Sequence, residues 1–160
     1  MATEKLKFVV ELYATYWQNP PVAEILINND SKFKGEITTD KENPTRIEFE
    51  QEFEDGQPFD IIIDRTNKGK YDTIVNAKGD ILHDQILHIK YMEVDEIDLG
   101  SVLYEGVYTP AYPEPWATQQ RDKGIDLPES QKNNTILGHN GVWKLSAKSP
   151  FYMWLLENLY

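Results

Sequence analysis

The loop at residues 75–85 collects the side chains best suited to holding a metal ion. Oxygen-bearing residues and a turn glycine follow one another there: Asn76, Gly79, Asp80 and Asp84. Asp64, at the end of a preceding predicted strand, could approach the same loop. Calcium takes about six to eight oxygen ligands in a bent loop, so this set predicts a calcium site. A hairpin turn with solvated aspartates explains the same residues, because their spacing is not that of an EF-hand.

Aromatic side chains form the second group with a chemical use. Tyr104, Tyr108, Tyr112 and Trp116 recur at intervals of four, and flat rings of this kind stack on the apolar faces of sugars. The intervening prolines forbid a regular helix through the segment, so the interval does not place the rings on one face. Packing against the domain or against a neighbouring protein is the alternative. The candidate ligand or partner contacts are Tyr108, Tyr112, Trp116, Trp143 and Trp154.

No pattern marks a catalytic centre. A glycosidase needs two carboxylates flanking the bond that it cleaves, and 27 acidic residues offer many pairs without singling one out. His83, His88 and His139 are interpreted as surface or turn residues. The chain has no serine nucleophile elbow, phosphate loop or HExxH motif. We therefore predict a protein that is not an enzyme, and an enzyme acting on carbohydrate is the remotest hypothesis.

Composition and charge narrow the classes of partner. The 160 residues carry 27 acidic and 16 basic side chains, a net charge of −11, which repels nucleic acid. No apolar run reaches the length of about twenty residues that a membrane-spanning helix needs, and the absence of cysteine excludes disulfides. The acidic strand face of Glu48, Glu50 and Glu52 is either solvated or a docking face for a basic partner. We expect neither a nucleic acid nor a membrane as partner.

The elements that must position these residues are mostly strands. Apolar and polar residues alternate in many short segments separated by turn residues, which predicts strands. The predicted strands cover residues 6–16, 22–27, 33–38, 46–53, 59–64, 71–75, 86–94 and 142–147. Little helical periodicity appears, so the pattern favours an all-β fold, an antiparallel β-sandwich or jelly roll formed by residues 1–160 as a single domain. In the strand at 86–94, Leu87, Ile89 and Tyr91 are expected to share the core face.

Two segments depart from this strand pattern. Residues 103–135 are rich in aromatics and proline and then polar, which predicts a long irregular segment that is functional or interfacial. Residues 149–159 predict a short C-terminal helix, because Ser149 and Pro150 suit its start and Phe151, Trp154 and Leu155 recur at helical spacing. We expect Ser149 to cap this helix.

The middle of the chain resembles a known class of binding domain. An Asn-containing loop and an Asp precede the strand Ile86-Leu87-His88-Ile89-Lys90-Tyr91, which leads to the turn at residues 95–98. This order is similar to that in calcium-dependent carbohydrate-binding modules of the xylan-binding β-sandwich type. It departs from theirs at Asp84-Gln85-Ile86-Leu87. The resemblance implies a calcium ion that coordinates sugar hydroxyls.

The C-terminal half resembles a second group, uncharacterised proteins of tailed bacteriophages, particularly marine myovirus-like ones. The segments that carry the likeness are Leu99-Gly100, Tyr108, residues 113–120, residues 138–143 and residues 149–152. The resemblance implies a small virion or accessory protein. It also implies a location in the virion after synthesis in the host cytoplasm, which agrees with an N-terminal segment that lacks the features of a signal peptide.

These observations lead to two functional hypotheses. The first is a non-enzymatic structural or accessory protein of a bacteriophage particle, oligomeric and assembled with other virion proteins through the segment at 104–134 and the aromatic C-terminus. The second is a calcium-assisted module that recognises host-surface glycans, with the loop at 76–84 holding the ion and Tyr112 or Trp116 stacking on a sugar.

Overall fold

A computed structural model describes residues 2–159. The strands are β1 (Thr3–Thr15), β2 (Val22–Ile27), β3 (Asp30–Glu36), β4 (Thr45–Glu54), β5 (Pro58–Thr66), β6 (Ile74–Val75), β7 (Ile81–His83), β8 (Ile86–Val94), β9 (Ile97–Asp98), β10 (Val107–Pro110), β11 (Gln131–Lys132), β12 (Ile136–Leu137) and β13 (Gly141–Lys148). A 3-10 helix η1 (Gly100–Glu105) and two α-helices, α1 (Trp116–Asp122) and α2 (Phe151–Leu159), complete the chain.

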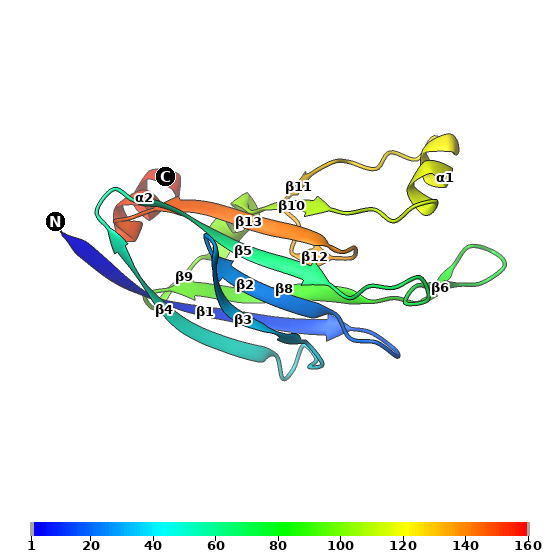
Figure 1. The fold of residues 1–160 in the computed structure, drawn as a ribbon, viewed down its shortest axis with the longest axis horizontal. Helices are drawn as coiled ribbons and strands as arrows, with labels where there is room; N and C mark the ends of the chain where they lie inside the picture. The colour runs from blue at the N-terminus through cyan, green and yellow to red at the C-terminus, as the bar shows by residue number, and fades with distance from the viewer. Residues whose placement is uncertain (1, 160) are drawn as a thin grey trace.

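The strands form two antiparallel sheets that face each other (Figure 1). One sheet has the order β12-β8-β1-β4 with β9 beside β8, and the other has the order β11-β10-β13-β5-β2-β3. The hairpin β6–β7 is a separate two-stranded piece. The predicted antiparallel sandwich is therefore confirmed.

The core lies between the sheets because each inner strand alternates apolar and polar residues. In β1, the side chains of Leu6, Phe8, Val10 and Leu12 are at most 1% exposed. From the facing sheet, Phe59 lies with its ring centroid 6.2 Å from that of Phe8. Full burial of such a side chain contributes about 1.5–3 kcal/mol, so this interior holds the two sheets together.

The face assignment of β8 is partly wrong. Leu87 and Ile89 are buried as predicted, but Met92 and Val94 are also buried and Tyr91 lies on the other face. The register between β1 and β8 shifts at this point, because Tyr91 pairs with Glu11 and the next pair is Ile89 with Leu12. A bulge adds one residue to one strand and so reverses the alternation beyond it.

The segment at residues 103–135 is more regular than predicted. It contains the end of η1, all of β10, helix α1 and strand β11. Pro110, Pro113 and Pro115 precede helix α1 and Pro128 follows it, so none interrupts it. The Pro113 carbonyl accepts a hydrogen bond from the Ala117 N–H at 2.8 Å. The Glu114 carboxylate accepts a hydrogen bond from the Thr118 N–H at 2.9 Å. A proline is tolerated at the start of a helix, and a carboxylate there satisfies a free N–H group.

The predicted C-terminal helix is confirmed, but its start is not capped as expected. The Ser149 hydroxyl donates to the Glu4 carboxylate at 2.6 Å, and the Phe151 N–H donates to the same oxygen at 3.0 Å. A β1 carboxylate thus takes the capping role that the sequence assigned to Ser149. Within residues 2–159, no helix has both the length and the apolar character needed to cross a membrane.

The two ends of the sandwich differ in structure. Strand pairings such as Thr15 with Ile86 and Arg65 with Gly141 bring five connections to one end: residues 16–21, 37–44, 67–85, 111–130 and 138–140. We call this the loop end, and in Figure 1 it lies at the right, with α1 and the β6 hairpin. Helix α2 and the N-terminus lie at the opposite end.

Candidate functional site

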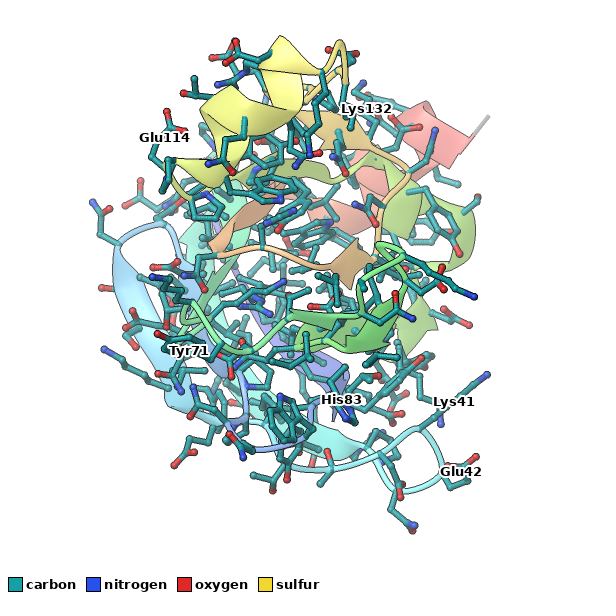
Figure 2. The ribbon with its side chains drawn as sticks, turned by 90° about the vertical axis from the view of Figure 1, so that its right-hand side faces the viewer. Lys41, Glu42, Tyr71, His83, Glu114 and Lys132 are labelled. Carbon is teal, nitrogen blue, oxygen red and sulfur yellow. The ribbon has the colours of Figure 1, made fainter. Side chains whose placement is uncertain are left out.

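Exposed aromatic rings mark the loop end. The indole of Trp17 stacks on the imidazole of His83, with ring centroids 4.7 Å apart and planes inclined by 13°. Trp17 comes from the β1–β2 connection and His83 from the β6–β7 hairpin, and Trp17 is 41% exposed. Figure 2 shows His83 and Tyr71 on the face seen from the loop end, and Tyr71 is 72% exposed. The Trp17–His83 pair therefore presents a flat, exposed aromatic surface.

A second aromatic cluster lies at the same end. The rings of Tyr112, Trp116 and His139 are neighbours, with centroid distances of 6.2 Å for Tyr112–Trp116 and 5.3 Å for Trp116–His139. Burial lowers the pKa of His139 to about 4, so its imidazole is neutral at pH 7 and can donate or accept a hydrogen bond. Trp116 is 36% exposed. Two of the predicted contact residues, Tyr112 and Trp116, are thus brought together.

A buried arginine links two of the connections at the loop end. Arg65, at the end of β5, is 0% exposed. Its guanidinium donates to the Leu137 carbonyl at 3.2 Å, the Asn140 Oδ1 at 2.9 Å and the Gln85 carbonyl at 2.6 Å. Burial lowers the pKa of Arg65 to about 10, so the group stays charged at pH 7. It joins the connections at 67–85 and 138–140.

A second buried side chain ties in the connection that carries Trp17. The Gln85 amide donates to the Asn19 carbonyl at 2.7 Å and to the Asn67 carbonyl at 3.0 Å. Asn67 donates in turn to the Pro20 carbonyl at 2.9 Å. The Gln85 Oε1 is buried and has no hydrogen-bond partner within residues 2–159. The connection at 16–21 is therefore held at a fixed position beside the hairpin.

An ion pair within the connection at 67–85 also contacts the connection at 138–140. Lys68 Nζ donates to the Asp84 Oδ1 at 2.9 Å and to the Gly138 carbonyl at 2.5 Å. The same Asp84 oxygen accepts from the Thr73 hydroxyl at 2.6 Å and from the Gln85 N–H at 2.8 Å. Burial raises the pKa of Asp84, but the hydrogen bonds from Thr73 and Lys68 and the charge of Lys68 outweigh it and lower the pKa overall. Asp84 is therefore ionised, and its Oδ1 already accepts three hydrogen bonds.

Only two of the four predicted calcium ligands, Asn76 and Asp80, come together. Asn76 and Asp80 form an exposed turn, in which the Asn76 Oδ1 accepts from the Lys78 and Asp80 N–H groups. Asp64 lies elsewhere on β5, where its charged neighbours are Glu24 and Lys34. Among residues 2–159, no three His, Cys, Asp or Glu side chains gather closely enough to hold a metal ion. Since calcium needs about six to eight oxygens, these residues do not fit it.

Other predicted contact residues are part of the interior or lie at the opposite end. Trp143 is 0% and Tyr108 2% exposed, so neither can touch a partner at the surface. The Tyr108 hydroxyl donates to the His139 carbonyl and accepts from the His139 N–H at 2.9 Å. Trp154, on α2, packs on Phe151 with centroids 5.6 Å apart. Tyr108 acts instead as a support beneath the second aromatic cluster.

The hollows at the opposite end are shallow. One, of about 490 Å³, is lined by Thr3, Glu52, Phe53, Glu54 and Gln57. Another, of about 180 Å³, is lined in part by Lys148, Met153, Trp154 and Glu157. Neither lining contains a pair of stacked, exposed aromatic rings. The loop end, with its stacked rings on a buried polar network, is the better candidate site.

Comparison with known proteins identifies the fold. No protein-family model matches the chain. No curated protein matches it either. A solved structure of vCBM60, described as linking two families of calcium-dependent carbohydrate binding modules through circular permutation, covers 88% of this chain and 89% of its own chain, with 11% identity and a TM-score of 0.50. This chain has the β-sandwich fold of a carbohydrate-binding module. A structure of vCBM60 in complex with galactobiose covers 87% of this chain and 96% of its own, with 13% identity and a TM-score of 0.47.

The sequence patterns single out Tyr112, Trp116 and Asp84, but not Trp17, Arg65 or Lys68. Trp17 stands just before Asn19-Pro20-Pro21, outside any strand pattern, and only its place in a turn at a strand end signals exposure. Arg65 and Lys68 look like ordinary charges after a strand. A basic residue at an inward position of an alternating strand is the one signal for Arg65, because a charge there needs buried partners.

Proposed function

We propose that this chain is a non-catalytic carbohydrate-binding domain whose ligand lies across the loop end. The observation that carries the proposal is the Trp17–His83 stack, an exposed flat ring pair held by two different connections. Aromatic faces of this kind pack against the C–H faces of sugars while polar groups around them take the hydroxyls. The sandwich fold shared with a carbohydrate-binding module supports the same proposal.

The surroundings favour a neutral glycan. The net charge of −11 repels anionic sugars in solution. The neutral imidazole of His139 and the ring of Trp116 offer a hydrogen-bonding group and a second stacking face at the same end of the sandwich. An open end without a deep pocket suits a sugar chain that lies along the surface. Calcium is not part of the proposal, because the residues suggested for it lie apart.

A glycan array tests the proposal. The parent should bind a set of neutral oligosaccharides, and Trp17→Ala should reduce binding by about tenfold or more, since a stacked ring contributes about 0.5–1.5 kcal/mol in addition to the hydrophobic gain from its buried area. Tyr152→Ala is the matched control, because Tyr152 is 59% exposed on α2 at the opposite end. Absence of binding by the parent, or equal binding by parent and Trp17→Ala, contradicts the proposal.

A role in a bacteriophage particle is the second candidate. The observation in its favour is the outer face of α2, where Tyr152, Met153 and Leu156 are 59%, 58% and 43% exposed. Apolar groups grouped in this way are common at protein–protein contacts. A domain fixed in a particle by α2 would leave its loop end free for host glycans. Mass spectrometry of purified particles tests this role, and absence of the chain from them contradicts it.

A further inference from the structure

We propose that the Lys68 ammonium is the built-in cation around which the loop end is assembled, so that this end folds and works without calcium. The inference about folding stands alone, and the part about ligand binding rests on the proposed carbohydrate function. The solved vCBM60 structure that shares this fold is described in terms of calcium-dependent carbohydrate binding modules. In residues 2–159 of this chain, by contrast, no three His, Cys, Asp or Glu side chains gather closely enough to hold a metal ion. This difference is the basis of the inference.

The contacts of Lys68 are those of a bridging ion. Its ammonium lies between a carboxylate, Asp84 Oδ1 at 2.9 Å, and a backbone carbonyl, Gly138 at 2.5 Å. These oxygens belong to two connections that are separated in the sequence and meet only at this end. Carboxylates and backbone carbonyls are also the oxygens that calcium selects. The ammonium therefore satisfies groups that a hard cation would otherwise bind.

The surroundings show that this position is built into the fold. The backbone of Lys68 is fixed by Asn140, whose Oδ1 accepts from the Lys68 N–H at 2.9 Å and whose amide donates to the Lys68 carbonyl at 3.1 Å. The side chains of Lys68 and Asp84 are only 14% and 21% exposed. In the other ion pairs of residues 2–159 the basic side chain is at least 48% exposed, as in Lys5 with Glu50 at 67% and 52%. An ion pair that is withdrawn from water is weakened little by salt.

A metal ion at this position would meet two obstacles. The Asp84 Oδ1 already accepts from Thr73, Gln85 and Lys68. The positive charges of Lys68 and of Arg65, which binds the neighbouring Gln85 carbonyl at 2.6 Å, would also repel a divalent ion. The loop end is thus already supplied with cations from its own chain.

Thermal melting of four proteins tests the inference. The parent should melt at the same temperature in EDTA and in millimolar calcium, since a ligand that binds only the folded state must raise the Tm. Lys68→Met should lower the Tm by roughly 5 °C, because it leaves a half-buried carboxylate without its partner. The exposed Lys70 provides the matched control, Lys70→Met, which should stay within about 1 °C of the parent.

The fourth protein separates the charge from the packing of the lysine. Lys68→Met combined with Asp84→Asn has neither charge, so it should regain part of the stability that Lys68→Met loses, and it should be folded even where Lys68→Met is not. A rise of the parent Tm with calcium overturns the inference. So does a Lys68→Met protein that melts with the parent, or a double variant that regains nothing. None of these readings uses a glycan, so they are independent of whether sugar binds.

Discussion

Replacing Arg65 by methionine should destabilise the protein more than replacing any exposed arginine. Arg65 is 0% exposed, and its guanidinium donates to the Leu137 carbonyl, the Gln85 carbonyl and the Asn140 Oδ1. Leu137 and Gln85 are themselves 0% exposed, so methionine leaves buried acceptors without donors. Each such loss costs about 1–3 kcal/mol, partly offset because the guanidinium itself no longer has to be buried.

The net loss should be about 3–5 kcal/mol, which lowers the Tm by roughly 10 °C for a chain of this size. Arg46→Met is the control: the Arg46 side chain is 48% exposed and pairs with Glu11 at 2.9 Å, so its loss should cost about 1 kcal/mol or less. Urea unfolding of the three proteins gives both values. An Arg65→Met protein no less stable than Arg46→Met would refute the view that a buried guanidinium holds the loop end.

Three further changes probe other parts of the fold. A Cβ built on Gly106 would overlap the indole of Trp143, whereas a Cβ on Gly138 would meet open space. In urea unfolding, Gly106→Ala should therefore lower the free energy of unfolding by about 1–3 kcal/mol, and Gly138→Ala should lower it much less. Equal losses for the two variants would contradict the packing of Gly106 against Trp143. His139 has its pKa lowered by burial from 6.5 to about 4, so the unfolded chain binds more protons between these values and stability must fall as the pH drops through that window. After allowance for partial exposure the loss from pH 7 to pH 5 is about 1 kcal/mol, and His139→Gln should remove that part of the slope in melting curves. The Glu4 carboxylate accepts hydrogen bonds from the Ser149 hydroxyl and from the Phe151 N–H at the start of α2. Glu4→Gln should therefore lower the Tm by a few degrees and speed amide hydrogen exchange in α2. Unchanged exchange in α2 would contradict the capping role of Glu4.

The strands were predictable because their signal is local. Alternation in β1, β4, β5 and β13 lies within a few consecutive residues, and burial follows it. The bulge opposite Glu11 was not predictable, since it depends on how β1 and β8 pair and leaves no mark on the composition of either strand. The alternation alone therefore predicts the wrong face of the sheet for the Tyr91 side chain.

The candidate site was much less predictable, because its parts are distant in sequence. Arg65 reaches Leu137 across 72 positions and Asn140 across 75, and no local pattern announces such contacts. The carboxylate of Asp84 suggests a metal ligand, but in the structure it accepts hydrogen bonds from Lys68 and Thr73. The residue type alone suggests a surface contact for each tryptophan, although a tryptophan in an alternating strand, such as Trp143, points inward by the same rule that predicts the strand.

Trp17 is the residue through which the central proposal is tested most directly. The chain has 4 tryptophans, and each gives a separate indole N–H signal in a nitrogen–proton NMR spectrum. Trp17 and Trp116 lie at the loop end, Trp143 is fully buried, and Trp154 lies on α2. Titration of the parent with a neutral oligosaccharide in EDTA should shift the signal of Trp17, with Trp116 moving as well, and leave that of Trp154 unchanged. A glycan that shifts Trp154 and not Trp17, or binding that appears only when calcium is added, would contradict the account.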